Sequence, residues 1–346
     1  MTGRRILGSA AMAAAAAVLL GGIYWAGRPL AGGQVVVYTS IDEIQARRVL
    51  EGFERQTGIR VRPVFDTEAA KTTGLALRIL SETSRPRADV FWNNELSKTL
   101  ELAKKGALRP YASPSAADIP AEWKDAGGAW AGSAIRARVI VYNSELVGEG
   151  AAPKKLEDLC GARFRGKVGI ADPRFGTTSS HAGALAAAWG REKALDFFRR
   201  LKANGARVYQ GNSAVRDAAA SGEILAGLTD TDDVLLGQGR GMKIGMSVPD
   251  QQAGELGTLV IANTVSVIAG APHPKEAERL VDYLLSREVE KNFAVPKEGW
   301  IPVREGLGAG GEAASLSSIK PMKVDWDQVS QLSAPFSAEA AKVLLE

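Results

Sequence analysis

The stretch IRARVIVYN, residues 135–143, combines two arginines with apolar residues in the pattern of a β-strand. Apolar strand patterns alternate with helical patterns before this stretch, and a second alternating series follows it. A lone strand between two such series indicates that the chain leaves one α/β unit and enters another. The stretch therefore predicts two lobes instead of one continuous single-domain sheet.

The first series predicts three strands and three helices, as in a largely parallel sheet. In its first helix, Ile41, Ile44 and Phe53 recur on one side, and Gly58 marks the end. The strands are expected at 32–40, 59–65 and 88–94, and the helices at 41–58, 71–84 and 95–106.

The second series follows the same pattern, and an apolar strand and a long helix come after it. Its strands are expected at 166–173, 207–211 and 224–230, its helices at 179–190 and 212–222, the later strand at 257–270 and the long helix at 274–294. We expect the two lobes to be joined by crossovers near 133–143 and 248–262.

The composition of the 346 residues excludes several classes of protein. The net charge is only +4 and there is no dense basic run with aromatics, which argues against nucleic-acid binding. Cys160 is the single cysteine, so neither an intrachain disulfide nor a four-cysteine metal site can form. The two histidines lie far apart, and the hydrolase, zinc-protease and phosphate-loop motifs are absent. We therefore expect no enzyme and no catalytic cofactor.

The N-terminus resembles an export signal. A basic start, MTGRR, precedes residues 6–26, which carry no charge and match the length of a membrane span. We expect residues 1–33 to form a signal peptide or an inner-membrane anchor, with the globular part in the periplasm.

Three aspartates cluster in GLTDTDDVL, residues 227–235, where a strand ends and a helix begins. Asp230, Asp232 and Asp233 either cap the helix or hold a cation. Ligands of parallel sheets bind at the carboxyl ends of the strands, so other strand ends are also candidates. These are Ser40, Asp42, Asn94 and Glu95.

Hydroxyl groups gather in FGTTSSHAGA, residues 175–184, and in GNSAV, residues 211–215, each at an expected helix start. Helix N-termini offer free N–H groups and a positive dipole end, which suit an anion, although ordinary capping by Ser or Thr gives the same pattern. The expected anion-binding residues are Thr177, Thr178, Ser179, Ser180, Asn212 and Ser213. Arg136 and Arg138 share one strand face and are possible contributors, to the cleft or to surface salt bridges.

Several runs, among them ADVFW, IRARVIVYN, FRGKVGIADP and GNSAVRDAAASGEILAGLTD, resemble the periplasmic solute-binding proteins of ABC importers. The chain looks most like their ferric-ion-binding branch (family 1). The resemblance implies a type II two-lobed α/β fold with the ligand cleft between the lobes. The corresponding domains are 34–135 (first lobe), 136–255 (second lobe), 256–305 (return to the first lobe) and 306–346 (C-terminal helical segment).

The resemblance also implies a site and partners. In the ferric branch two adjacent tyrosines bind the metal, and they fall on Asp232 and Asp233 in this sequence. A ligating histidine falls near Asp42, and a glutamate falls on Asn94, with Glu95 beside it. The family acts as monomers that deliver a small ligand to an ABC permease.

The ligand predicted from these residues is Fe³⁺ or another hard metal ion with a synergistic anion, because carboxylates are hard donors. A zwitterion such as an aminophosphonate also satisfies both halves of the site. A third alternative is an anchored sensor domain that serves no transporter.

Overall fold

The computed structural model describes residues 33–66, 73–293, 299–307 and 318–346. The expected signal or anchor at 6–26 lies outside these residues. In the part of the chain that is described, no helix has the length and apolar character needed to cross a membrane.

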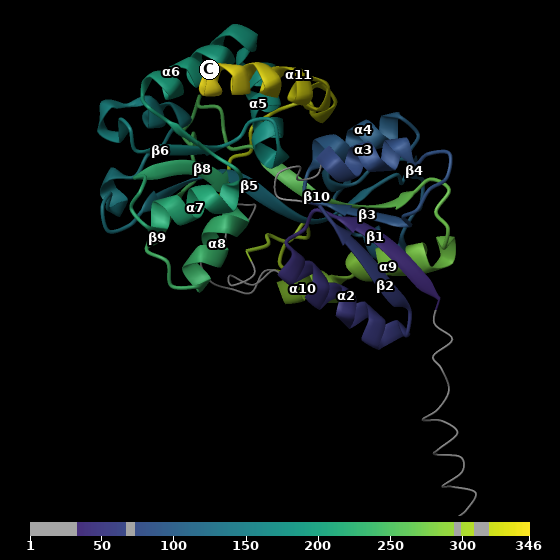
Figure 1. Ribbon diagram of the computed structural model, residues 1–346. Helices are drawn as coiled ribbons and strands as arrows, with labels where there is room; N and C mark the ends of the chain where they lie inside the picture. The colour runs from purple at the N-terminus through teal and green to yellow at the C-terminus, as the bar shows by residue number, and fades with distance from the viewer. Residues whose placement is uncertain (1–32, 67–72, 294–298, 308–317) are drawn as a thin grey trace, which may run out of the picture.

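Two α/β halves lie on either side of a pair of long crossing strands (Figure 1). The order of hydrogen-bonded strands is β2-β1-β3-β10-β5-β8-β6-β7, with β4 beside β10 and β9 beside β5. The strands are β1 (Gln34–Thr39), β2 (Arg60–Phe65), β3 (Val90–Asn93), β4 (Leu108–Arg109), β5 (Ala131–Asn143), β6 (Val168–Ala171), β7 (Arg207–Tyr209), β8 (Ala226–Asp230), β9 (Ile244–Ser247) and β10 (Val260–Ile268).

Strand β5 changes partners halfway along its length. It pairs with β10 up to Ala137 and with β8 from Arg138 onward. All thirteen of its residues are buried, as a strand covered on both faces requires. The stretch that predicted two lobes is thus the strand that passes from one to the other, and the two-lobed α/β fold is confirmed.

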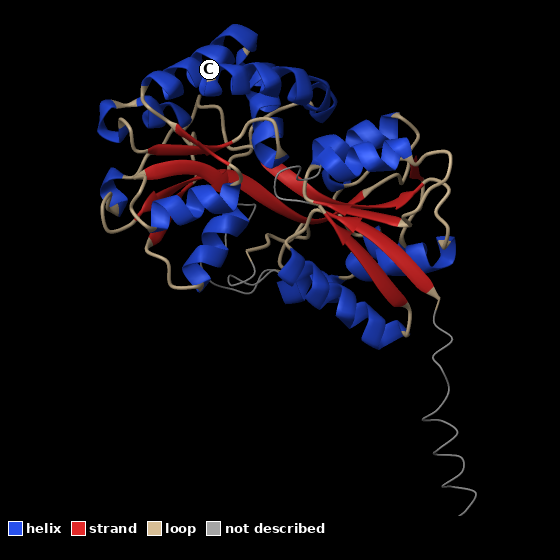
Figure 2. Cartoon of the chain, in the orientation of Figure 1, coloured by secondary structure: helices blue, strands red, loops and turns tan. Residues whose placement is uncertain are grey.

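Helices cover both faces of each half (Figure 2). In the half that contains β1, helices α3 and α4 lie on one face and α2, α9 and α10 on the other. In the other half, α5, α6 and α11 lie opposite α7 and α8. The helices are α2 (Glu43–Thr57), α3 (Thr73–Ser81), α4 (Leu96–Lys104), α5 (Gly176–Trp189), α6 (Arg191–Ala203), α7 (Asn212–Ala220), α8 (Thr231–Gly239), α9 (Pro274–Leu284), α10 (Arg287–Phe293) and α11 (Trp326–Leu345).

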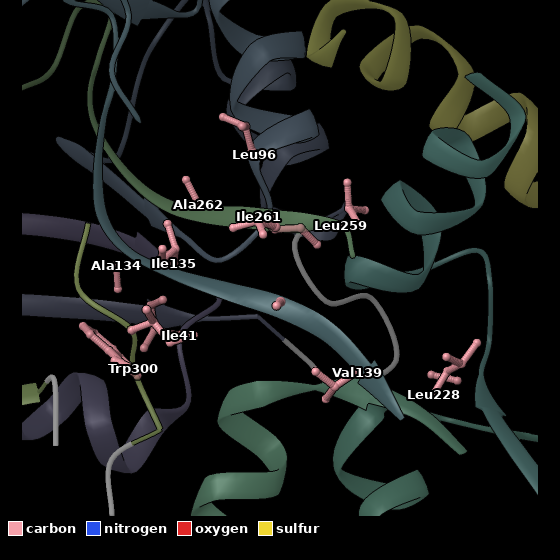
Figure 3. Packing of buried hydrophobic residues seen from close by; sticks show 14 of the residues in the cluster. Ile41, Leu96, Ala134, Ile135, Val139, Leu228, Leu259, Ile261, Ala262 and Trp300 are labelled. Atoms are coloured by element: carbon pink, nitrogen blue, oxygen red, sulfur yellow. The ribbon is translucent and has the colours of Figure 1, made fainter. Parts of the chain in front are cut away.

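The apolar core is continuous across the crossing strands. Figure 3 shows side chains of β5 and β10 in this cluster, among them Ile135, Val139 and Ile261, each 1% exposed or less. Because the same cluster reaches residues of both halves, the crossing region packs as a core rather than as a flexible linker.

Two of the predicted helices that differ from the structure show a physical reason for the difference. The first begins at Glu43, because the Asp42 side chain accepts hydrogen bonds from the N–H groups of Ile44 and Gln45. Ile44, expected in the core, is 65% exposed. The predicted long helix at 274–294 is two helices, and the Ser286 hydroxyl accepts from the Val289 N–H where the second begins.

Helix α11 packs closely on α5 at Gly183. A Cβ at this glycine would lie 2.9 Å from both the Cα and the backbone N of Ser333. Such a contact with backbone atoms cannot relax without moving one helix. The small residue therefore sets the distance between α5 and α11.

We predict that Gly183→Ala lowers the free energy of unfolding. Overpacking costs about 1–3 kcal/mol, which exceeds the gain of about 1 kcal/mol from replacing a helical glycine. Urea denaturation measures the change. Gly52→Ala in α2 is the matched control, because its Cβ would meet side-chain ends of Tyr283 and Arg55 and no backbone atom. Equal stability changes for the two variants would contradict the assignment.

Candidate functional site

A cavity of about 310 Å³ lies at the strand ends between the two halves. Residues from both halves and from both crossing strands line it. The lining includes nine of the residues predicted from the sequence, namely Asp42, Asn94, Arg136, Thr177, Thr178, Asn212, Ser213, Asp232 and Asp233.

A buried ion pair lies behind the cavity wall. Arg138 Nη1 donates to Asp230 Oδ1 at 2.7 Å, and both side chains are 1% exposed or less. The same nitrogen reaches Thr177 Oγ1 at 3.2 Å and Asn212 Oδ1 at 3.1 Å. Thr177 and Asn212 in turn donate to Asp230 Oδ2. These bonds fix the starts of α5 and α7 against the end of β8.

Each aspartate of the cluster faces an arginine from another segment. Arg136 lies 3.2 Å from Asp232 and 3.5 Å from Asp230, and it also donates to the Asn94 carbonyl across the cleft. Arg216 Nη1 is 3.8 Å from Asp233 Oδ1. The segment 227–235 itself contains no basic residue. The partners come from β5 and α7, which only the fold brings near.

The pKa values of the two inner aspartates shift in opposite directions. Burial opposes ionisation of Asp230, but Arg138 and Arg136 outweigh it and lower its pKa. Burial raises the pKa of Asp232, with Asp230 adding to the effect and Arg136 opposing it. Asp230, Asp232 and Asp233 each offer a carboxylate oxygen, and these oxygens all lie within 4.8 Å of one another. The cluster has the donor atoms for a hard cation.

Helix capping does not explain the aspartates. Asp230 occupies the N-cap position of α8, but its side chain makes no capping hydrogen bond and turns to Arg138. In the described chain, the N-cap residues of α5 and α7, Phe175 and Gly211, also give no side-chain cap. The first turns of both helices thus line the cavity without a side-chain cap on their N–H groups, and such helix starts suit an anion.

Ser179 and Ser180, predicted as anion ligands, do not line the cavity. Helix α5 begins at Gly176, three residues before the predicted start, so both serines lie inside the helix. Ser179 contacts Ser333 and Ser337 of α11, whereas Ser180 donates to Glu95 Oε1 at 2.5 Å. The structure thus does not place these two serines with the other predicted anion ligands, because the helix turns their side chains toward other elements.

Four other candidates lie outside the cavity lining. Glu95 is 2% exposed, and burial raises its pKa against the opposing effects of Ser180 and Arg136. Ser40 donates to Asn94 Oδ1 at 2.9 Å and supports that lining residue. Asp230 and Arg138 form the buried pair. These residues position the site from behind and do not face its interior.

Sequence reasoning missed several lining residues, among them Arg216, Asn263 and Trp300. Arg216 lies four residues after Asn212 on α7 and so on the same helix face, a spacing visible in the sequence. Asn263 is a polar residue inside the apolar strand β10, which is also a detectable signal. Trp300 lies in the lining without any sequence pattern to mark it. His181 is buried, and burial lowers its pKa to about 3.

Gly299 brings the two halves into contact at the aspartates. Its φ is +77°, and a Cβ would lie 2.7 Å from the Asp232 carbonyl oxygen and 2.8 Å from the Asp232 Cα. The backbone of the segment that carries Trp300 therefore touches the start of α8. A glycine satisfies both the left-handed conformation and the close approach.

We predict that Arg138→Met lowers the free energy of unfolding by about 3–5 kcal/mol, because Asp230 loses its closest cation while remaining buried. Arg138→Met/Asp230→Asn recovers part of the loss, since the buried carboxylate is gone. Urea denaturation is the measurement. Arg200→Met serves as control, because Arg200 and its partner Glu157 are both 46% exposed, and such pairs contribute about 0–1 kcal/mol. Similar losses for Arg138→Met and Arg200→Met would refute the prediction.

We predict that Gly299→Ala pushes the two halves apart, at a cost of about 1–3 kcal/mol for the contact. Small-angle X-ray scattering then gives a larger radius of gyration than for the unchanged protein. Gly306→Ala is the control, because Gly306 has a φ of +76° but a Cβ added to it would meet nothing within 4 Å. Superimposable scattering curves for Gly299→Ala and Gly306→Ala would contradict a role of Gly299 in holding the two halves together.

The sequence of this chain is similar to those of known binding proteins. The family model described as "Bacterial extracellular solute-binding protein" matches residues 98–332. The chain is 27% identical over 324 residues to "Iron uptake protein A1" of Synechocystis, covering 89% of this chain and 84% of that protein. It is 24% identical over 297 residues to the "Putative 2-aminoethylphosphonate-binding periplasmic protein" of Salmonella typhimurium, covering 83% and 84%.

The fold has a close counterpart among solved structures. Iron-bound HitA from Pseudomonas aeruginosa superimposes with a TM-score of 0.79 at 24% identity, over 89% of this chain and 99% of that one. The resemblance noted in the sequence is thus confirmed, and with it the expectation of a binding protein rather than an enzyme. Since the family model matches well over half of its length, the chain belongs to the bacterial extracellular solute-binding proteins.

Proposed function

We propose that this protein is the periplasmic binding component of an ABC importer and that its cleft takes a hard metal ion together with an anion. Ferric iron is the first candidate ion. The observation that carries the proposal is the juxtaposition, in one cavity, of a carboxylate cluster and the uncapped starts of α5 and α7. Relatives with the names "Iron uptake protein A1" and "Major ferric iron-binding protein" support the choice of ion.

The arginines make the anion a requirement. The cavity is lined by Arg136, Arg216 and Arg240, and Arg138 lies directly behind it, so a bare trivalent ion would meet four nearby positive charges. An anion such as citrate or carbonate offsets this repulsion. It would bind Thr177, Thr178, Asn212 and Ser213 at the helix starts, while the metal binds Asp232 and Asp233. Without the tyrosine pair of the ferric branch, the protein also supplies no phenolate ligand to the metal there.

The arrangement of the chain follows from the same proposal. Residues 34–135 and 256–305 would form one lobe and 136–255 the other, with 306–346 as a C-terminal segment. Asp42 and Asn94 then approach Asp232 and Asp233 from opposite walls of the cleft. We propose residues 6–26 as the export signal or inner-membrane anchor, and a monomer as the form that meets the permease.

A zwitterion with an amine and a phosphonate is the second candidate ligand. The pairing of each aspartate in the cluster of Asp230, Asp232 and Asp233 with an arginine favours it, because this part of the cleft is close to electrically balanced and accepts a balanced ligand. The amine would bind Asp232 or Asp233, and the phosphonate would bind the starts of α5 and α7. The aminoethylphosphonate-binding relative is consistent with this chemistry. The anchored-sensor alternative has no specific observation in its favour.

Isothermal titration of the metal-free protein decides between the ligands. We expect Fe³⁺–citrate to bind, citrate alone to bind more weakly, and Asp232→Asn/Asp233→Asn to weaken Fe³⁺–citrate binding by about 2–5 kcal/mol. The control, Glu192→Gln/Asp196→Asn, removes two charges from exposed positions on α6 and should bind like the unchanged protein.

Tight binding of 2-aminoethylphosphonate with no response to Fe³⁺–citrate would assign the cleft to the zwitterion. Fe³⁺–citrate binding that is unaffected by the double aspartate variant would reject the proposed metal ligands.

A further inference from the structure

Asn263 has an unusual position on β10. The residue is 3% exposed and lines the cavity, yet its Oδ1 has no hydrogen-bond partner among the described residues. A buried acceptor without a partner costs about 1–3 kcal/mol, so folded proteins rarely keep one without a use. On a residue that lines a ligand cavity, such an acceptor gains its partner when a ligand with a donor group or a cation binds.

The sheet register places Asn263 beside the charged part of the cleft. Asn263 pairs with Ala134 of β5, and Ile261 pairs with Arg136. Side chains two residues apart on a strand share one face, and directly paired residues point to the same side. Asn263 is therefore a diagonal neighbour of Arg136, the residue that reaches Asp232.

A β-bulge holds the Asn263 backbone in place. The register shifts between Asn263 and Thr264, because Thr264 pairs with Gly132 and leaves Ser133 of β5 as the extra residue. Ser133 Oγ donates to the Asn263 carbonyl at 3.4 Å and accepts from Trp92 Nε1 at 3.3 Å. Bulges near binding sites commonly redirect a side chain. At this bulge the Asn263 main chain is held by a hydrogen bond, while Asn263 Oδ1 has no partner among the described residues.

Asn93 shows what a purely structural asparagine looks like in this fold. It lies on the adjacent strand β3 and is fully buried, and both ends of its amide are bonded. Its Nδ2 donates to the Glu95 carbonyl and to Thr99, and its Oδ1 accepts from the Glu95 N–H. Asn263 has the same burial without an equivalent set of bonds to its Oδ1. The contrast argues against a packing role for Asn263.

A second unused acceptor lies in the same cavity. Asp232 Oδ2 bonds Arg136, but Asp232 Oδ1 is buried and has no partner in the described part of the chain. Carboxylate and amide oxygens are both hard donors that bind metal ions and accept from ammonium groups. Asp232 lies in the first turn of α8 and Asn263 on the crossing strand β10, and both residues line the same cavity.

We propose that Asn263 is a ligand-binding residue and that its Oδ1, with Asp232 Oδ1, binds the electropositive part of the cargo. The inference deepens the function proposed above and rests on the cleft being the binding site. It adds a neutral acceptor on the crossing strand to a site otherwise made of charged groups and helix starts. Asn263 thereby selects cargo that carries a cation or an N–H donor.

The test compares Asn263→Leu, which removes the acceptor at similar size, with Asn263→Asp, which keeps it. Ser266→Ala is the matched control, since Ser266 lies on the same strand, is 2% exposed and is absent from the cavity lining. Titration calorimetry of the full chain uses Fe³⁺–citrate and 2-aminoethylphosphonate as probes. The melting temperature of each unliganded variant is the second measurement.

We expect Asn263→Leu to weaken binding of whichever probe the protein takes by about tenfold or more, as for a lost hydrogen bond to a charged group. Asn263→Asp keeps or strengthens binding, and Ser266→Ala leaves it unchanged. Unliganded Asn263→Leu melts at the same temperature as the unchanged protein or higher, because an unused buried acceptor is gone.

Three results would overturn the inference. They are unchanged probe affinity in Asn263→Leu, a lower melting temperature of that unliganded variant, and equal losses of affinity in Asn263→Leu and Asn263→Asp. The last would mean that the amide N–H₂ faces the anion. If the unchanged protein binds neither probe, the proposed function fails. The melting temperature of unliganded Asn263→Leu then still tests the role of Asn263. A value equal to or above that of the unchanged protein supports a ligand role, and a lower value supports a structural role.

Discussion

The ion pair between Arg138 and Asp230 is the interaction on which the site depends. Arg138 begins the part of β5 that pairs with β8, and Asp230 is the last residue of β8. The ion pair therefore joins the two strands at the point where the chain enters the second half. Through Thr177 and Asn212 it also fixes the starts of α5 and α7. Two buried charges with several hydrogen bonds tolerate little displacement, because any gap leaves a charge without compensation.

The arginines change what the aspartates can do. Three carboxylates alone would attract cations of many kinds, but here each carboxylate is shared with a guanidinium from β5 or α7. A cation must therefore compete with a resident charge, and an anion finds the same arginines nearby. Such a cleft discriminates by the charge balance of its cargo as well as by the donor atoms. Burial raises the pKa of Asp232, whereas the two arginines lower the pKa of Asp230, so Asp232 is the more easily protonated of these two carboxylates.

The sequence predicted the fold better than the site. Apolar runs with the right periods locate β1, β3, β5 and β10, because burial on both faces leaves a clear pattern. The site depends on which side chains meet across the cleft, and sequence neighbours carry little of that information. Asp232 and Asp233 were found through their position at a strand end, but their partners Arg136 and Arg216 lie far away in the chain.

A helix boundary accounts for the two serines that do not line the cavity. The run TTSS looked like the approach to a helix, so its hydroxyl groups were all expected at the N-terminus. In the structure the helix starts at Gly176, and one turn of rotation sends Ser179 toward α11 and Ser180 toward Glu95. Because the helix starts three residues earlier than predicted, Thr177 and Thr178 line the cavity, whereas Ser179 and Ser180 do not.

The exposure of Ile44 has a thermodynamic consequence. This side chain is 65% exposed and lines the cavity, where the half-buried Leu236 adds further apolar surface. A cargo that draws the walls together removes this surface from water. Burial of apolar surface gives a negative heat-capacity change, so the enthalpy of binding becomes more favourable as the temperature rises, even for a cargo held mainly by charges.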